Sequence, residues 1–251
     1  MNITGNTILI TGGGSGIGRG LAESFHALGN QVIIAGRRQQ ALDETTAANP
    51  GMKSAILDVE DAGVIRAFAA RLTKDYPALN VLINNAGIMR AENLLTQPED
   101  LADMEATIVT NLFGPLRLTA ALLSHLQKQP QATIINLSSG LAFVPLALTP
   151  TYSATKAAIH SYTQALRFQL RETTIQVIEL IPPAVATDLM AGGASDPRRM
   201  PLNEYIAESM NLLKTQPSAM EISVERVKFL RFAAESGQFD SVFNTMNPAS
   251  R

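Results

Sequence analysis

Short apolar runs and longer amphipathic stretches alternate along most of this chain. Six runs rich in Ile, Val and Leu are each closed by Gly, Asn, Asp, Ser or Pro, as is typical of strands buried on both faces of a parallel sheet. These runs cover residues 7–11, 31–35, 55–58, 81–84, 132–137 and 175–181. The stretches between them repeat apolar residues three and four positions apart, which is the spacing of one helix face.

The helical patterns cover residues 21–28, 41–48, 62–76, 101–126, 150–170 and 224–235. Gly114-Pro115 interrupts the longest of them, and a kink is expected there because proline removes a main-chain hydrogen bond. Strands separated by helices of this length require right-handed crossovers. The pattern therefore predicts an α/β fold over 1–251 as one domain: a doubly wound parallel sheet of Rossmann type, with about six to seven strands in the order 3-2-1-4-5-6, in a three-layer α/β/α arrangement.

The periodicity weakens between residues 184 and 220. Four of the nine methionines lie there, namely Met190, Met200, Met210 and Met220. Soft unbranched side chains suit a substrate lid at about 188–220, but packing against the sheet explains them equally well. The tail 239–243 is expected to form a short strand or to dock on the body of the protein.

Composition excludes several functional classes. Lys and Arg number 20 against 22 Asp and Glu, and no long basic run occurs, so neither nucleic acid nor an anionic membrane is an expected partner. There are no cysteines for disulfides or thiolate metal sites. The N-terminus lacks a signal-like pattern and no apolar run reaches the ~20 residues of a membrane span, which makes the cytoplasm the expected location.

The glycine-rich turn 12–18 stands between the first predicted strand and the first predicted helix. Glycine is needed where the backbone approaches a pyrophosphate without Cβ atoms in the way, and the following helix offers free N–H groups and a positive dipole. This position predicts a dinucleotide site.

The second strand ends at Gly36-Arg37-Arg38, where an NAD site usually places a carboxylate for the adenosine ribose. A guanidinium pairs with a 2′-phosphate, whereas an acid would repel it. We therefore expect NADP(H) as the cofactor and consider NAD(H) the weaker candidate. Alternatively, both arginines merely solvate the turn.

Tyr152 and Lys156 lie one helical turn apart, just after a helix start at Pro150. A nearby cation in a partly dry cleft stabilises a phenolate and so prepares a tyrosine for proton transfer at neutral pH. A solvated surface pair is the alternative. Ser138-Ser139-Gly140 ends the fifth strand, at the sheet edge where ligands bind in open α/β folds.

Taken together, these motifs resemble the short-chain dehydrogenase/reductase superfamily, and the resemblance runs from Ile8 to about Thr187. It rests on Thr11-Gly12-x-x-x-Gly16-x-Gly18, Asp58, Asn84-Asn85-Ala86-Gly87, Asn111, Ser139 and Tyr152-x-x-x-Lys156. Ser139 precedes Tyr152 by thirteen residues, which is the usual separation in that family.

The resemblance implies hydride transfer between a nicotinamide and a small carbonyl or secondary alcohol substrate. Tyr152 would be the general acid or base, and Lys156 would lower its pKa and bind the nicotinamide ribose. Ser139 would hold the substrate oxygen, and Asn111 would anchor a water in a proton relay. The alternative for Asn111 is that it only satisfies main-chain groups near Pro115.

The same resemblance implies the cofactor contacts. Gly12, Gly16 and Gly18 would form the pyrophosphate turn, Asp58 would contact adenine, Asn85 and Ala86 would line the adenosine ribose, and Val185 and Thr187 would hold the carboxamide. The expected cofactor-binding set also contains Thr11, Gly14, Ser15, Ile17, Arg37, Arg38, Val59, Gly87, Tyr152, Lys156 and Pro182. An ordinary turn role is the alternative for Asp58.

The sequence departs from the family pattern at two places, and there the residue roles implied by the resemblance are less secure. Pro182-Pro183 replaces the usual Pro-Gly after the sixth strand, and the C-terminus lacks the usual glycine-rich seventh strand. That strand often builds one tetramer interface, so a homodimer is as plausible as a homotetramer. No metal is expected, because His26, His125 and His160 show no ligand-like grouping in the sequence. A non-catalytic NADP(H) sensor or scaffold and an isomerase or dehydratase remain as alternative functions.

Overall fold

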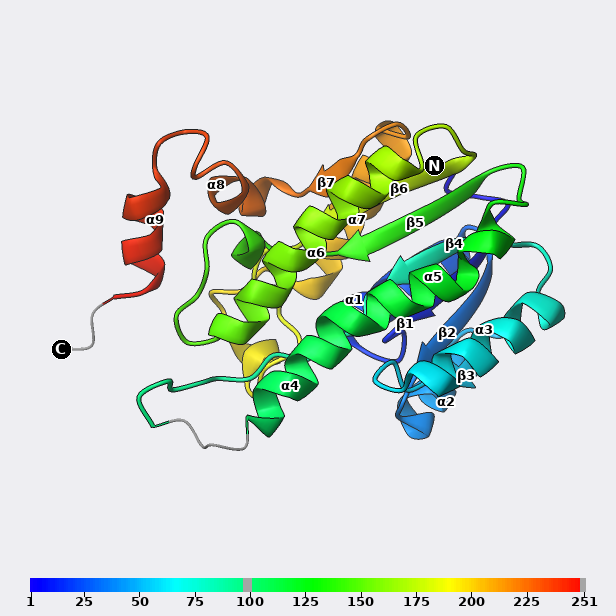
Figure 1. Cartoon of the computed structure of the whole chain (residues 1–251), viewed down its shortest axis with the longest axis horizontal. Coiled ribbons are helices and arrows are strands. Elements are labelled where there is room, and N and C mark those ends of the chain that lie inside the picture. The colour runs from blue at the N-terminus through cyan, green and yellow to red at the C-terminus, as the bar shows by residue number, and fades with distance from the viewer. Residues whose placement is uncertain (97–100, 249–251) are drawn as a thin grey trace.

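Seven parallel strands form one sheet in the computed structural model, which describes residues 1–96 and 101–248. The strands are β1 (Thr7–Thr11), β2 (Gln31–Gly36), β3 (Lys53–Ile56), β4 (Leu79–Asn84), β5 (Ala132–Leu137), β6 (Ile175–Ile181) and β7 (Glu221–Ser223). Their order is β3-β2-β1-β4-β5-β6-β7 (Figure 1). The predicted order is confirmed, and the short strand β7 extends it by one position.

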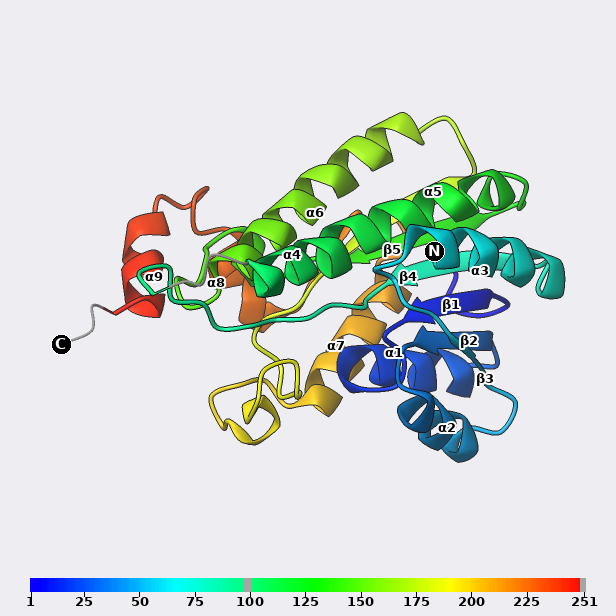
Figure 2. The ribbon, with the colours of Figure 1, turned by 60° about the horizontal axis from the view of Figure 1, so that its bottom comes forward.

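Helices cover both faces of this sheet. The α-helices of the described residues are α1 (Gly16–Ala27), α2 (Gln39–Ala48), α3 (Ala62–Asp75), α4 (Ala102–Ile108), α5 (Gly114–Leu126), α6 (Pro150–Gln169), α7 (Leu202–Thr215), α8 (Lys228–Arg231) and α9 (Phe239–Met246). Figure 2 shows α3, α5 and α6 on one side of the sheet and α1, α2 and α7 on the other. Neighbouring strand residues supply the two cores: Ile8 and Ile10 pack toward α1, and Leu9 packs toward α3. Burial on both faces explains why the strands read as continuous apolar runs.

The long helical stretch is irregular just before the predicted kink. Val109–Phe113 forms a π-helical turn between α4 and α5, and it directs the buried side chains of Thr110 and Asn111 inward. Gly114 allows close contact with the loop after β3, since an added Cβ would lie 3.1 Å from Val59. The wide turn thus brings Asn111 toward the carboxyl edge of the sheet.

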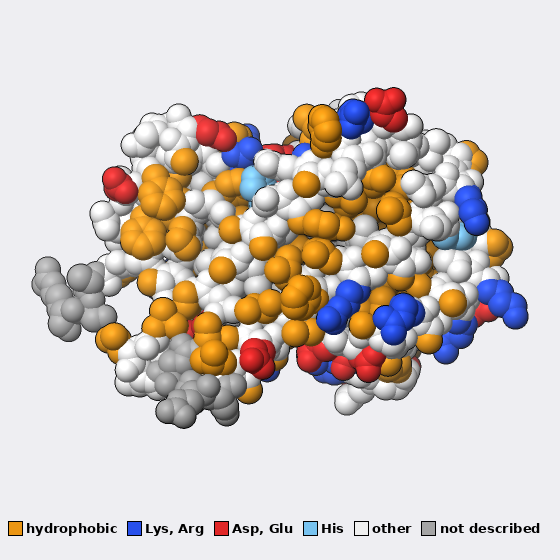
Figure 3. Space-filling model, viewed as in Figure 1, with side chains coloured by type: hydrophobic (Ala, Val, Ile, Leu, Met, Phe, Trp, Pro, Cys, Tyr) orange, Lys and Arg blue, Asp and Glu red, His pale blue; other side chains and the backbone are white. Residues whose placement is uncertain are grey.

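The combined stretch Ala102–Leu126 is long and apolar enough to cross a membrane by length and composition. Its inner face packs on the sheet through Leu118, Leu122 and Leu126, as the core helices of globular proteins do. Apolar side chains also gather along the outer face of α5 and α6 in Figure 3. Phe113 and Phe168 are 42% and 67% exposed there.

The segment after β6 follows an irregular path before it enters α7. Val185 and Met200 pair as an isolated parallel bridge, which closes the segment into a loop. Met200 is buried and Met210 packs against the same core, whereas Met220 is 60% exposed. Packing therefore accounts for Met200 and Met210, and it does not account for Met220.

The C-terminal region differs most from expectation. The helix predicted over 224–235 is reduced to a 3₁₀ turn, Glu225–Val227, followed by the four-residue α8. A short strand over 239–243 is wrong, because that tail forms the helix α9. The alternative expectation, docking, is confirmed. The apolar face of α9 packs on Val144, Leu230 and Ala233.

Candidate active site

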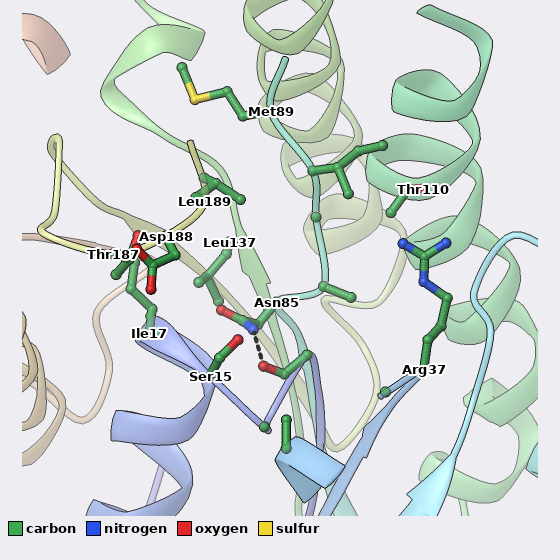
Figure 4. Close-up of a pocket in the computed structure, with 18 of the residues that line it drawn as sticks. Ser15, Ile17, Arg37, Asn85, Met89, Thr110, Leu137, Thr187, Asp188 and Leu189 are labelled. Carbon is green, nitrogen blue, oxygen red and sulfur yellow. Dashed lines mark hydrogen bonds between the residues drawn. The ribbon is translucent and has the colours of Figure 1, made fainter. Parts of the chain in front are cut away.

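A cavity of about 710 Å³ opens at the carboxyl edge of the sheet, between the glycine turn and the start of α6 (Figure 4). Its size fits a drug-sized or cofactor-sized ligand. Fifteen predicted site residues line it: Gly12, Gly14, Ser15, Gly16, Ile17, Arg37, Arg38, Val59, Asn85, Ala86, Gly87, Tyr152, Lys156, Pro182 and Thr187. The remaining predicted residues, Thr11, Gly18, Asp58, Asn111, Ser139 and Val185, lie behind or beside its wall.

The glycine turn is built by close backbone approach. Gly12 and Gly16 have φ angles of +68° and +52°, a region that side chains rarely adopt. An added Cβ at Gly18 would overlap the Asn85 amide and lie 2.9 Å from the Gly12 carbonyl carbon. The N-cap residue Ser15 makes no side-chain capping bond, so the first N–H groups of α1 are available to an anion.

Thr11 and Asn85 lock the ends of β1 and β4 together under this turn. The Thr11 hydroxyl accepts from the main-chain N–H groups of Asn85 and Ala86 at 3.0 and 3.1 Å. The Asn85 amide donates to the carbonyl oxygens of Thr11 and Gly12 at 2.8 and 3.3 Å. The dashed line at Asn85 in Figure 4 belongs to this set. Both residues hold the shape of the cavity floor.

The two arginines after β2 have different partners. The Arg37 guanidinium lies 2.6 Å from the Glu60 carboxylate, which also accepts from Thr110 at 2.8 Å. Arg38 instead donates to the Ser15 hydroxyl at 2.8 Å, beside the glycine turn. Sequence reasoning missed Glu60, whose position two residues after Asp58 was the only available signal.

Tyr152 and Ser139 meet at the inner end of the cavity. Both side chains are buried, and the Ser139 hydroxyl accepts from the Leu141 N–H at 3.1 Å. Burial raises the pKa of Tyr152 to about 12, although the hydrogen bond from Ser139 opposes this rise. Tyr152 is therefore protonated at neutral pH in the cofactor-free protein.

Lys156 extends beside Tyr152 from the next turn of α6. Its ammonium lies 5.5 Å from the centre of the Tyr152 ring and donates to the Leu137 carbonyl at 2.9 Å. Burial lowers the pKa of Lys156 to about 8, and the carboxylate of Glu179 acts in the opposite direction. The ammonium and the phenol thus share one buried end of the cavity.

Asn111 uses its whole side chain on protein groups. Its amide oxygen accepts from the Ile88 N–H at 2.8 Å, and its amide nitrogen donates to the Ile88 carbonyl at 2.8 Å and to the Thr155 hydroxyl at 3.3 Å. This clamp fixes the strand end after β4 against α6. The water-anchoring role stays a prediction.

Three further residues around the wall have defined positions. Asp58 accepts from the Glu60 N–H at 3.0 Å, so its carboxylate stabilises the turn in which it lies. Val185 is buried in the core. Ser138 lines the cavity, and its buried hydroxyl has no hydrogen-bond partner among the described residues. Sequence reasoning did not select Ser138, although it directly precedes Ser139.

The histidine prediction needs a correction. His160, Glu179 and Glu221 place one potential ligand atom each within 4.8 Å of one another, although they are far apart in the chain. His160 already contacts Glu179 at 2.8 Å, and Arg231 donates to both oxygens of Glu221 at 2.8 and 3.2 Å. Both carboxylates therefore have protein partners, and their chemistry does not favour a metal.

Comparisons with known proteins agree with one another. A family model described as short chain dehydrogenase matches residues 6–197. An uncharacterized oxidoreductase, DltE of Bacillus subtilis, is 41% identical over 251 residues, covering 98% of each chain. Dehydrogenase/reductase SDR family member 7B of Mus musculus is 31% identical over 191 residues, which cover 72% of this chain and 58% of that protein.

Solved structures share the fold. A short-chain dehydrogenase from Streptomyces avermitilis has a TM-score of 0.82 and 26% identity over 98% of both chains. Two Burkholderia structures cover both chains completely with a TM-score of 0.82: one from B. cenocepacia in complex with NADP, 23% identical, and one from B. phymatum in complex with NAD, 20% identical.

Proposed function

The chain belongs to the short chain dehydrogenase family, and we propose that it is an NADP(H)-dependent oxidoreductase acting on a carbonyl or secondary alcohol. One observation carries this proposal: the Tyr152 phenol lies with Ser139 and the Lys156 ammonium at one buried end of a cavity that begins at a glycine turn. A proton donor and an oxygen-binding hydroxyl meet at a single point there.

The cavity fits a dinucleotide. The turn leaves no room for Cβ atoms at Gly12 or Gly18, and the open N-terminus of α1 suits a pyrophosphate. Val59, Asn85 and Ala86 would line the adenosine end, while Pro182 and Thr187, which follow β6, line the same cavity, with Thr187 close to Gly16. When bound there, the nicotinamide supplies or accepts the hydride.

The proton is handled by this chain's own residues. In reduction, Tyr152 donates its phenolic proton to the substrate oxygen as negative charge develops on it. Ser139 holds the same oxygen by a hydrogen bond. The Lys156 ammonium favours the phenolate that results, because an opposite charge nearby stabilises the ionised form. The raised pKa of Tyr152 keeps the proton in place until substrate arrives.

The preference for NADP(H) is supported by charge. The end of β2 presents Arg37 and Arg38 rather than an acid, and Arg38 with Ser15 forms a donor pair beside the turn. A guanidinium and a hydroxyl suit a 2′-phosphate. Glu60 already partners Arg37, so Arg38 is the freer of the two guanidinium groups for a phosphate.

The substrate half of the cavity is lined by Ile88, Met89, Leu189 and Leu202, and Met89 and Leu189 stand at its upper end in Figure 4. These apolar side chains favour a hydrophobic carbonyl compound. We assign the lid to residues 188–220 within one domain. Arg198, which lies there, pairs with Asp196 at 2.9 Å and is 88% exposed, so it serves the loop.

Assembly and location complete the proposal. The alanines Ala154, Ala157 and Ala165 are exposed on α6, and the exposed Phe168 follows them near the end of the helix. A smooth apolar helix face next to the exposed Phe113 suits a homodimer, with a homotetramer as its extension. We place the protein in the cytoplasm, where NADP(H) is available.

The decisive test is turnover by the wild type and by Tyr152→Phe. NADPH oxidation is followed by absorbance across a panel of ketones, aldehydes and secondary alcohols. We expect carbonyl-dependent NADPH loss in the wild type and a drop of ~100-fold or more in Tyr152→Phe, with unchanged NADPH affinity. Normal turnover in Tyr152→Phe would remove the catalytic proposal. NADPH binding without net consumption would favour the sensor, isomerase or dehydratase alternatives.

A further inference from the structure

Two pairs of side chains on the first turns of α6 point in different directions. Tyr152 and Lys156 lie one helical turn apart and line the cavity. Thr151 and Thr155 form a second pair with the same spacing, and each precedes its partner in the first pair by one residue, which is a rotation of about 100° on a helix. Both threonines are buried. The contacts of the threonine pair therefore determine how this part of α6 is rotated about its axis.

The segment 88–92, which follows β4, is tied to Thr155 at its first residue. The Asn111 amide holds the main chain of Ile88 by two hydrogen bonds, both at 2.8 Å, and also donates to the Thr155 hydroxyl at 3.3 Å. That hydroxyl in turn donates to the carbonyl oxygen of Tyr152 at 2.7 Å. One end of the segment is thus joined to the main chain of the tyrosine itself.

The other end of segment 88–92 is the half-buried Glu92, whose carboxylate binds the first turn of α6. One oxygen accepts from the Thr151 N–H at 3.1 Å, and the other accepts from the Thr151 hydroxyl at 2.7 Å. Thr149, at the N-cap position, makes no side-chain capping bond. A carboxylate at a helix N-terminus satisfies a free N–H group and is favoured by the helix dipole. Glu92 therefore caps α6 from 59 residues away, directly before Tyr152.

Between these two anchors, segment 88–92 forms part of the cavity wall. Met89 and Arg90 line the cavity, and Met89 stands at its upper end in Figure 4. The Arg90 guanidinium pairs with Asp103 of α4, on the outer side of the segment. The contacts of Glu92 therefore join a wall of the substrate half to the helix turn that carries the proton donor.

We propose that Glu92 is a positioning residue: its two bonds to Thr151 fix the start of α6 against the substrate wall and so direct the Tyr152 hydroxyl toward the substrate oxygen. Glu92 acts through Thr151, since it lies outside the lining of the cavity. The capping contact does not depend on any activity, whereas its consequence for turnover rests on the proposed function. That consequence is large because a reacting group displaced by about 1 Å loses up to ~100-fold in rate.

The cap is measurable without turnover. Amide hydrogen exchange of the cofactor-free protein, followed by mass spectrometry, compares the wild type with Glu92→Ala in peptides that cover residues 88–92 and 148–158. We expect exchange at the start of α6 to become about fivefold faster in Glu92→Ala, which is the factor that loss of a helix cap produces. Exchange in segment 88–92 should rise with it, and exchange in the glycine turn should not change. Unchanged exchange at the start of α6 in Glu92→Ala overturns the proposal.

The matched control is Asp61→Ala. Asp61 also caps a helix with its carboxylate, accepting from two N–H groups in the first turn of α3. Its removal should accelerate exchange in α3 by a similar factor and leave the start of α6 unchanged. Faster exchange at the start of α6 in both variants would reflect a general loss of stability and would overturn the proposal.

Further variants keep the test valid if Glu92→Ala does not fold. Glu92→Gln retains an oxygen for the Thr151 N–H and offers an amide donor to the Thr151 hydroxyl, so exchange should return to near the wild-type rate. Thr151→Val removes only the hydroxyl bond and should accelerate exchange at the start of α6. Thr151→Ser keeps that bond and should match the wild type. Equal exchange in Thr151→Val and Thr151→Ser overturns the proposal.

With a substrate in hand, the effect on turnover has its own measurement. In Glu92→Ala, kcat for carbonyl reduction should fall by ~10-fold or more, because the proton donor is misdirected, while the dissociation constant of NADPH stays at the wild-type value. Glu92→Gln should restore kcat, and Asp61→Ala should leave it unchanged. An unchanged kcat in Glu92→Ala, or an equal fall in Asp61→Ala, overturns the positioning role. Absence of turnover in the wild type would count against the proposed function only, and the exchange experiment would then decide the capping role.

Discussion

The dinucleotide region (residues 7–87) and the substrate region (residues 184–247) are built on different principles. In the proposed dinucleotide region the main chain would form much of the binding surface, because Gly12 and Gly18 approach Asn85 closely and the side chains of Thr11 and Asn85 are hydrogen-bonded to the main chain. In the substrate region the surface is made by apolar side chains of short helices and loops. The first kind of surface permits few substitutions, whereas the second permits many. Pyrophosphate recognition is therefore visible in the sequence, and substrate recognition is not.

The largest expected effect comes from Gly18→Ala, which attacks the dinucleotide region where space is tightest. The new Cβ would overlap the Gly12 carbonyl and the Asn85 amide, so the turn must open. We expect NADPH affinity to fall by ~100-fold or more and stability to fall by ~2–3 kcal/mol. Fluorescence titration with NADPH and urea unfolding measure the two quantities.

Gly63→Ala is the matched control for that change. Gly63 lies in the first turn of α3, and the nearest atom to its added Cβ is an Asp61 carboxylate oxygen at 3.1 Å, which caps the helix by accepting from the N–H groups of Gly63 and Val64. NADPH affinity should stay close to the wild-type value, and loss of stability should not exceed the ~1 kcal/mol of an N-cap. If Gly18→Ala behaved like this control, the turn would not be the rigid surface described above.

The next effect concerns Lys156, at the boundary of the two regions. Lys156→Met should stabilise the cofactor-free protein at pH 7 by ~2–3 kcal/mol, because a charge that burial disfavours is removed. The pKa of Lys156 in the folded state, about 8, already includes the help from Glu179. Urea unfolding compares this variant with Lys214→Met, which changes an exposed lysine of α7 and should show no gain.

The sign of the pH dependence follows from linkage. The folded-state pKa of Lys156, about 8, lies below the ~10.4 of an unfolded lysine, so the unfolded chain binds more protons between these values. Wild-type stability therefore rises with pH across that window. The advantage of Lys156→Met should be largest below pH 8 and should shrink by pH 10. A constant advantage would mean that the ammonium is not desolvated in the folded protein.

Pattern analysis located the strands well because each is a short apolar run with a clear stop. The sheet order matches the structure, as do the C-terminal ends of five of the six predicted strands to within one residue, and the third strand ends two residues earlier than predicted, at Ile56. The tail shows the limit. Phe239, Val242, Phe243 and Met246 repeat at helical spacing, but the first five residues alone resemble a strand. Five residues are too few to distinguish the 3.6-residue repeat of a helix from the two-residue repeat of a strand.

The residues of the candidate site also fall into two groups, those that the local sequence predicts and those that it does not. Glycines and the Tyr152/Lys156 spacing are local signals, and the structure gathers them around one cavity. Glu60 and Glu179 carry only weak local signals. Their effects depend on partners 23 and 19 residues away, Arg37 and His160, that only the crossovers bring together. A buried carboxylate in an apolar strand was the one clue to Glu179, since such a group needs a partner.

A smaller effect is expected at the adenosine end. Arg38→Ala should weaken NADPH binding by ~10-fold to 30-fold and leave NADH binding unchanged, because a charge-assisted bond to the 2′-phosphate is lost. Arg37→Ala should have a weaker effect, since Glu60 neutralises Arg37. Dissociation constants for both cofactors in both variants test this order. A larger effect of Arg37→Ala would return the phosphate role to Arg37, and unchanged ratios in both would refute the preference.

The smallest expected effect is that of Asn247→Ala in the substrate region. It tests directly whether the substrate region and the dinucleotide region act independently. The Asn247 side chain ties the end of α9 to the loop after Ser139, accepting from the Ala147 N–H at 2.6 Å and donating to the Pro145 carbonyl at 3.0 Å. In Asn247→Ala this loop is less constrained, and an unpaired main-chain group costs about 1 kcal/mol. We expect KM for bulky carbonyl substrates to rise by up to about fivefold while NADPH affinity stays unchanged, because ~1 kcal/mol corresponds to a factor of about five.

Thr245→Ala is the control for Asn247→Ala, since the Thr245 hydroxyl bonds only to Ser241 within α9. Steady-state kinetics with one large and one small substrate, together with NADPH titration, separates the outcomes. A change in KM for the large substrate alone places α9 in substrate selection. A change in NADPH affinity would mean that the C-terminal helix supports the dinucleotide region as well, and the two regions would then not be independent. Their independence is what allows one family of dinucleotide sites to carry many substrate surfaces.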